Sequence, residues 1–282
     1  MHRHEFVEGA SPPYTTLELP CEIEDQDGDG TFNAGDGIWL WARNWAERSG
    51  ASNYQRWWGD AEVVFVTRTL GGGLRVPQRA AWNDITGLTP LASYPFTQRH
   101  ERDSAPLMSF IASVADTNLG LWHWTDLAFY YNRPDTLRIT ARDVDTTRAG
   151  SMTVRWVGRR PDLHVMWAGL RNASGRFTPV IDSVSWLGMS AVTRTATFPG
   201  GALSEGNGNF YRHWGKNSAG PPNPASNFLS SSGLDWFDLT YWRRFRATAE
   251  YVRFNSAQAT GDVQMHVENF GSDSVRVYDV SD

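Results

Sequence analysis

The sequence predicts an all-β protein of two units, an N-terminal β domain over residues 1–125 and a jelly-roll β-sandwich over residues 126–282. Strand-length runs of β-branched and aromatic residues are separated by Gly, Pro, Asn and Asp about every 8–12 residues, a spacing typical of sandwiches and jelly rolls. No segment longer than about ten residues keeps the helical period of 3.6. The tryptophan-rich stretch DTNLGLWHWTDLAFYYNRP (116–134) indicates a passage between the two halves.

In the first unit, three segments have the composition of strands. TTLELPCEIE alternates between apolar and polar residues, and both GIWLWARNW and AEVVFVTRT are rich in β-branched and aromatic side chains. These segments span residues 15–24, 37–45 and 61–69. The segment APLMSFIASVAD (105–116) is the best candidate for a helix.

In the second unit, strand-length segments follow one another at regular spacing, interrupted by a long polar loop, GKNSAGPPNPASN (215–227). The alternation in WFDLTYWRRF predicts that Phe237, Leu239 and Tyr241 face the core, because this set is more apolar than Trp236, Asp238 and Thr240. The expected strands span residues 135–144, 151–159, 163–170, 180–188, 193–199, 236–245, 250–256 and 262–269.

Composition and charge exclude several classes of protein. Hydrophobic residues make up 40% and charged residues 20% of the chain, which is typical of a folded protein. The net charge of −5 leaves no basic footprint, so we expect no nucleic-acid partner. No apolar stretch reaches about 18 residues, so we expect no insertion into a membrane. The first residues lack the apolar segment of a signal peptide, and we expect the sequence to be a piece of a longer, exported protein.

The acidic stretch EDQDGDGTFNAGDG (24–37) has the spacing of a calcium loop. Numbered from Asp25, its oxygen-bearing residues fall at positions 1, 3, 5, 7, 9 and 12, and Gly30 falls at position 6, where the chain must turn sharply. The predicted Ca²⁺ ligands are Asp25, Asp27, Asp29, Thr31, Asn33 and Asp36. The alternative is a solvated Asp/Gly-rich turn that binds no metal.

Two features distinguish this stretch from a switching EF-hand. Position 12 is Asp36 in place of the usual Glu, and the flanking segments read as strands, whereas an EF-hand loop lies between helices. We therefore expect an EF-hand-like calcium loop within a β unit. Its role would be structural, because a bound ion stabilises the folded loop by mass action.

The segments around this loop resemble the region ahead of the catalytic domain in gingipain-like cysteine peptidases, peptidase family C25. DGDGTFNAGDGIWLWARNW and NYQRWWGDAEVVFVTRTLGGGLRV resemble its acidic loop, aromatic strand and glycine-rich turn, although AEVVFVT stands where the family has a Tyr-Trp pair. QRHERDSAPL resembles a short strand leading to a Glu-Asp pair, and LGLWHWTDL resembles a tryptophan-rich junction. SGLDWFDLTYWRRFRATAEYVRFNS resembles the closing strands of the jelly roll that follows, and FGSDSVRVYDVSD resembles the strand that enters the linker before the peptidase domain.

This resemblance covers roughly residues 22–282 and implies a non-catalytic accessory or pro-region of a secreted or cell-surface protein. Its partner would be a downstream peptidase domain of the same chain, which the region would support or latch. The family uses a His–Cys dyad with the histidine in a His-Gly context, and this sequence has no His-Gly pair. We expect Cys21 to be a buried structural thiol, because no neighbouring base or cation accompanies it in sequence.

Other residues offer weaker candidates for function. His100, Glu101 and Asp103 could join a metal shell, and the two acids could form a hydrolytic pair, but paired surface acids are common. Trp122 and Trp124 share a strand face and could either stack on sugar or pack between the units. The alternative function is therefore a calcium-dependent carbohydrate-binding module, and a free-standing hydrolase is the weakest reading.

Overall fold

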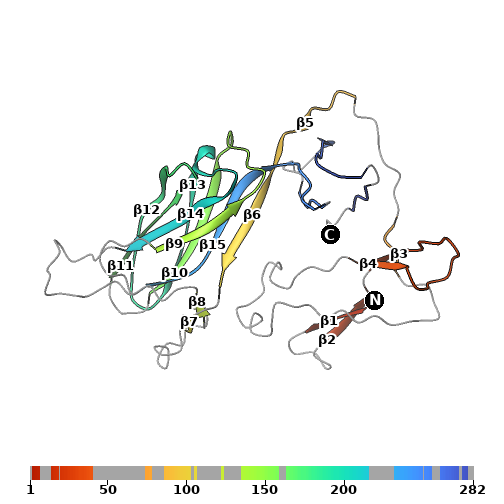
Figure 1. Ribbon diagram of the computed structural model, residues 1–282. Helices are drawn as coiled ribbons and strands as arrows, with labels where there is room; N and C mark the ends of the chain where they lie inside the picture. Colours follow the sequence, from red (N-terminus) through yellow and green to blue (C-terminus); the bar gives the residue numbers. More distant parts are fainter. Residues whose placement is uncertain are drawn as a thin grey trace. The chain divides into compact units, whose positions relative to one another are not determined.

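The computed structural model confirms an all-β fold for the described part of the chain (Figure 1). It describes residues 2–6, 14–18, 20–40, 74–77, 86–102, 105–106, 122–123, 135–158, 163–215, 232–249, 251–255, 261–272 and 275–278. The expected strand at 61–69 and most of the candidate helix at 105–116 lie outside these residues. Among the residues that are described, no helix is long and apolar enough to cross a bilayer.

The chain divides into two compact units, one formed by residues 1–84 and 276–282 and the other by residues 85–275. In the first unit, β1 (His2–Phe6) pairs with β2 (Tyr14–Glu18), and β3 (Cys21–Glu24) pairs with β4 (Gly37–Leu40), both antiparallel. Leu74 and Val76 extend the second pair, because their backbones exchange hydrogen bonds of 3.1 and 3.2 Å with Cys21.

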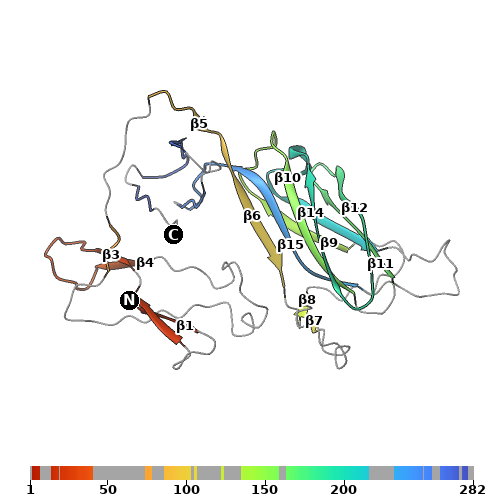
Figure 2. The same cartoon turned by 180° about the vertical axis from the view of Figure 1, so that it is seen from behind.

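The second unit is a sandwich of two four-stranded antiparallel sheets, seen from opposite sides in Figures 1 and 2. The strand order is β13-β10-β15-β6 in one sheet and β12-β11-β14-β9 in the other. The strands are β6 (Ser93–Glu101), β9 (Asp135–Ala141), β10 (Gly150–Gly158), β11 (Leu163–Arg171), β12 (Phe177–Leu187), β13 (Ala191–Phe198), β14 (Gly206–Gly215) and β15 (Ser232–Arg244).

Short elements flank this sandwich. Gly200–Ala202 (η4) form a single 3-10 turn between β13 and β14. β5 (Pro90–Leu91) pairs in parallel with β16 (Gln264–Met265), and β7 (Ala105–Pro106) pairs with β8 (Trp122–His123). Ala105 and Pro106, the described start of the candidate helix, are therefore extended.

The two sheets enclose one apolar core, which the inward residues of alternating strand positions fill. The predicted inner face of β15 is confirmed: Phe237 and Leu239 are fully buried, and Tyr241 is almost so. Trp156 of β10 and Tyr211 of β14 are also fully buried between the sheets. Burial of these large rings removes apolar surface from water and so stabilises the sandwich.

Three details differ from the sequence expectations. β6 pairs with β15 along nine residues, so residues 93–101 belong to the sandwich unit and not to the first unit in which the sequence placed them. β14 was not expected, because the glycines of GNGNFYRHWG resemble a loop. Residues 251–255 were expected as a strand but form only an isolated bridge, in which Tyr251 pairs with Thr248.

Candidate metal centre

The acidic loop connects β3 to β4, so the two strands hold its ends in register. Glu24 pairs with Gly37 at the loop end of the hairpin, and the acidic loop leaves from this pair. Gly28 and Gly30 have φ angles of +71° and +75°, which a β-carbon would strain. The glycines therefore allow the chain to wind tightly between successive aspartates, as the loop spacing predicted.

The first and last aspartates of the loop bind its backbone. The Asp25 carboxylate accepts hydrogen bonds from the N–H groups of Gly28 and Gly30, each at 2.7 Å. The Asp36 carboxylate accepts from the N–H groups of Gln26 at 2.9 Å and Asn33 at 2.8 Å. These four bonds wrap the backbone around the inside of the loop and satisfy donors that the turn leaves without strand partners.

The middle of the loop gathers oxygen atoms around a single point. The Asn33 side-chain N–H₂ donates to Asp27 Oδ2 and to Asp29 Oδ2, both at 3.1 Å, and to the Thr31 carbonyl at 3.3 Å. Its donation lowers the pKa of Asp27, and the Asp29 N–H lowers it further. An electropositive group thus lies where three acceptors of the loop converge.

Three exposed carboxylates, those of Asp25, Asp27 and Asp29, offer oxygen atoms within 4.8 Å of one another and could hold a metal ion. Thr31 and Asn33 contribute the nearby carbonyl and amide described above. Asp36 lies at the loop base, where both its oxygens accept backbone hydrogen bonds. Oxygen donors at this spacing match the preferences of hard cations.

A polar cluster supports the base of the loop. The Glu24 carboxylate accepts from the Trp39 indole at 2.7 Å and from Arg276 at 2.9 Å, and these two bonds lower its pKa. Arg276 also lies 3.9 Å from the Glu22 carboxylate, which accepts a hydrogen bond from the Tyr278 hydroxyl. Residues from the end of the chain are therefore attached to the strand that leads into the acidic loop.

Among the described residues of the sandwich unit, the carboxylates of the acidic loops do not come together in this way. Asp143 forms an ion pair with Arg243 at 2.9 Å, and Asp145 accepts from the Ser93 hydroxyl at 2.7 Å. The Glu205 carboxylate accepts two backbone N–H groups, those of Asp143 and Val144, each at 3.0 Å. Donors from the protein itself thus occupy these carboxylates.

The remaining sequence candidates fall into ordinary structural settings or outside the described residues. Cys21 is buried, as expected, with its sulfur 3.5 Å from an Arg75 nitrogen. His100 stacks on Phe237 with ring centroids 4.5 Å apart, and burial lowers its pKa to about 4. Glu101 forms an ion pair with Arg99 at 2.8 Å. Asp103, Trp124 and the side chain of Trp122 lie outside what the structure describes.

Sequence reasoning missed the outward face of β11 and β14, where Trp167 lies opposite Trp214. The signal was the alternation within LHVMWAGLR, which places Trp167 on the face opposite to His164 and Met166. The partner strand could not be named from sequence, because β14 itself was not expected.

Together, the fold and the loop define a two-unit all-β protein with an exposed acidic loop that could hold a metal ion. No family model matches the sequence, and no curated protein matches it. Among solved structures, the crystal structure of dimeric latent PorU from Porphyromonas gingivalis is similar over 67% of this chain, with a TM-score of 0.42 and 11% sequence identity. The match covers 16% of the PorU chain, and a likeness of this strength carries no argument about function.

Proposed function

We propose that the loop over residues 25–36 binds Ca²⁺ and stabilises the β3–β4 hairpin. The observation that supports this proposal is the convergence of Asp27 Oδ2, Asp29 Oδ2 and the Thr31 carbonyl on the Asn33 amide nitrogen. A cation at this point would replace one neutral donor with a full charge, and a flip of the Asn33 amide would turn its oxygen toward the ion. Neutralising neighbouring carboxylates in this way removes their mutual repulsion.

On this basis the chain would be a non-catalytic accessory or pro-region of a secreted gingipain-like protein, supporting or latching a downstream peptidase domain. The support is the ordered series of motifs across residues 22–282, together with the sandwich of two four-stranded antiparallel sheets. The strand orders β13-β10-β15-β6 and β12-β11-β14-β9 support a jelly roll, an arrangement of two linked Greek keys. The calcium loop would suit a secreted protein, because extracellular calcium would keep it loaded.

The direct test of the metal proposal is thermal unfolding in calcium and in EDTA. A ligand at 100 times its dissociation constant stabilises a folded protein by about 2.7 kcal/mol, which corresponds to a Tm rise of roughly 10–20 °C for a unit of about 90 residues. We expect this rise in the wild type and its loss in Asp27→Asn/Asp29→Asn. If calcium does not raise the Tm of the wild type, the proposal is wrong and the loop is a solvated turn.

A matched control separates metal binding from a general effect of charge. Asp182→Asn/Asp262→Asn removes the same two negative charges at exposed positions of the other unit. This variant should keep the full calcium shift. The latch is tested separately by calorimetric titration of the purified chain with the peptidase domain expected to follow it, and absence of binding would contradict that role.

A second candidate function, carbohydrate binding, is supported by a different observation. The rings of Trp167 and Trp214 lie parallel within 7°, with centroids 6.3 Å apart, on the outer face of the sheet. Parallel indole faces are suited to stacking on the flat faces of sugar rings. A pull-down with insoluble polysaccharides, compared between the wild type and Trp214→Ala, tests this candidate.

A further inference from the structure

The outer face of the sheet formed by β12, β11, β14 and β9 carries four half-buried aromatic side chains. Trp167 and Trp214 form a directly opposed pair on β11 and β14. The Phe177 ring lies 5.6 Å from Trp214 and covers Gly169, where a β-carbon would stand 2.5 Å from the ring. Phe210 lies on β14 two positions before Arg212, so both residues are on the outward face of that strand. Aromatic rings are therefore found on three neighbouring strands, β12, β11 and β14.

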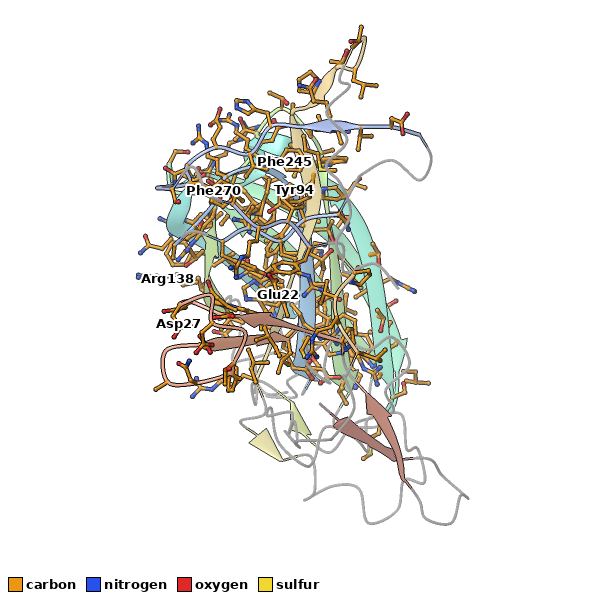
Figure 3. The ribbon with its side chains drawn as sticks, turned by 90° about the vertical axis from the view of Figure 1, so that its right-hand side faces the viewer. Glu22, Asp27, Tyr94, Arg138, Phe245 and Phe270 are labelled. Atoms are coloured by element: carbon orange, nitrogen blue, oxygen red, sulfur yellow. The ribbon has the colours of Figure 1, made fainter. Side chains whose placement is uncertain are left out.

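Three arginines alternate with these rings. Arg171 on β11 and Arg138 on β9 pair with Phe210 from its two sides, and each guanidinium carbon is 5.7 Å from that ring. Arg212 lies 5.7 Å from the Phe177 ring. Arg138 projects from its strand in Figure 3. These four aromatic residues and three arginines are called the aromatic–arginine face below.

The charge of this face is not compensated within the described part of the chain, where none of its three arginines forms an ion pair. The four strands carry two carboxylates: Asp135 lies 3.9 Å from the buried His213, and Asp182 is exposed at an irregularity of β12 near Trp167. The other sheet provides a contrast. There Arg99 lies 4.0 Å from the Trp236 ring but also forms ion pairs with Glu101 and Asp238.

We propose that the aromatic–arginine face binds an acidic polysaccharide, a polymer of sugars that carry carboxylate or sulfate groups. The aromatic rings would stack on sugar rings, and the guanidinium groups would pair with the acidic substituents, for which their planar geometry is suited. Its three guanidinium groups fall short of the broad basic surface on which nucleic-acid binding depends. This inference rests on the second candidate function, carbohydrate binding. It specifies the surface that binds the carbohydrate and the negative charge of that ligand.

The test measures binding of the full chain by biolayer interferometry in about 150 mM salt. The immobilised polymers are polygalacturonate, dextran sulfate and neutral dextran. The triple variant Arg138→Gln/Arg171→Gln/Arg212→Gln should weaken binding to an acidic polymer by roughly tenfold or more, because several charge-assisted contacts are lost. Trp214→Ala should weaken it as well. Comparison of polygalacturonate with dextran sulfate identifies whether carboxylate or sulfate is recognised.

A matched control uses arginines elsewhere in the same unit. Arg99→Gln/Arg194→Gln/Arg246→Gln removes the same charge and should leave binding unchanged, and thermal unfolding verifies that every variant is folded. An equal loss in both triple variants would overturn the proposal, since it would show unspecific attraction. Binding to neutral dextran alone would overturn the acidic ligand but keep carbohydrate binding, and binding to no polysaccharide would overturn both. Tighter binding to oligo-dT would overturn the proposal in favour of a nucleic acid.

Discussion

His213 of β14 lies inside the sandwich core, with its side chain fully buried and its Nδ1 3.0 Å from the Tyr211 hydroxyl. Burial lowers the pKa of His213 to about 3, although the Asp135 carboxylate lies 3.9 Å from Nε2 and would favour the charged ring. The desolvation of a charged imidazole outweighs a partner at that distance. His213 is therefore neutral in the folded protein at physiological pH.

This lowered pKa makes the stability of the sandwich depend on pH. In the unfolded chain a histidine has a pKa of about 6.5, so between pH 6.5 and 3 the unfolded state binds a proton that the folded state does not. Stability is thus fully present above pH 6.5 and declines as the pH falls. The whole difference is roughly 5 kcal/mol, of which about 2 kcal/mol is lost at pH 5.

His100 adds a second contribution of the same sign, because burial lowers its pKa to about 4. The wild type should therefore lose about 4 kcal/mol between pH 8 and pH 5 through these two histidines. In His213→Gln, which removes only one titrating ring, about half of this loss should remain. The free energy of unfolding from urea titrations at pH 5, 6, 7 and 8 measures both quantities.

Leu234→Ala is the control, because it weakens the same core by about 2–5 kcal/mol without removing a titrating group. Its stability should fall by the same amount at every pH. The reasoning would be refuted if His213→Gln and the wild type lost the same free energy between pH 8 and pH 5.

Three further predictions concern single positions. Phe237→Ala should lower the free energy of unfolding by about 3–5 kcal/mol in urea titrations, because the ring stacks between Tyr211 and His100; a loss below 1 kcal/mol would contradict this packing. Gly150→Ala should destabilise by about 1–3 kcal/mol, since its β-carbon would lie 2.4 Å from the Phe198 ring and 2.5 Å from the Thr240 carbonyl oxygen; an unchanged Tm would contradict this crowding. Cys21 should react with a thiol reagent only after unfolding, and rapid labelling of the native protein would argue against its burial.

The sequence predicted the class of fold and the strands whose alternation is strong. β10, β11, β13 and β15 fell within a few residues of their expected positions, and the inner residues of β15 were correct, because period-two alternation reports directly on which face is buried. β14 was not predicted, because this segment is extended through its pairing with β9 and β11 on either side. Tertiary pairing of this kind overrides a local composition that favours a loop.

The acidic loop and the aromatic–arginine face also differ in how far the sequence could predict them. Asp25, Asp27 and Asp29 could be identified because all the contacts of the loop lie within twelve residues of sequence. The aromatic–arginine face could not, because Arg138, Arg171 and Arg212 come from three strands whose order in the sheet follows from the topology. The spacing of residues in a sequence predicts which side chains lie close together within one loop. It does not predict which strands become neighbours in a sheet.

The ion pair between Arg276 and Glu24 joins residues 252 positions apart, and both belong to the unit formed by the two ends of the described chain. The sandwich is thus an insertion within that unit. During synthesis the sandwich can fold as soon as it has emerged, whereas the contact between Glu24 and Arg276 can form only after the residues that follow the sandwich have been made. The unit that holds the acidic loop is therefore interrupted by a second unit, and folding of the inserted sandwich shortens the flexible chain between Glu24 and Arg276 and so lowers the entropic cost of closing their contact.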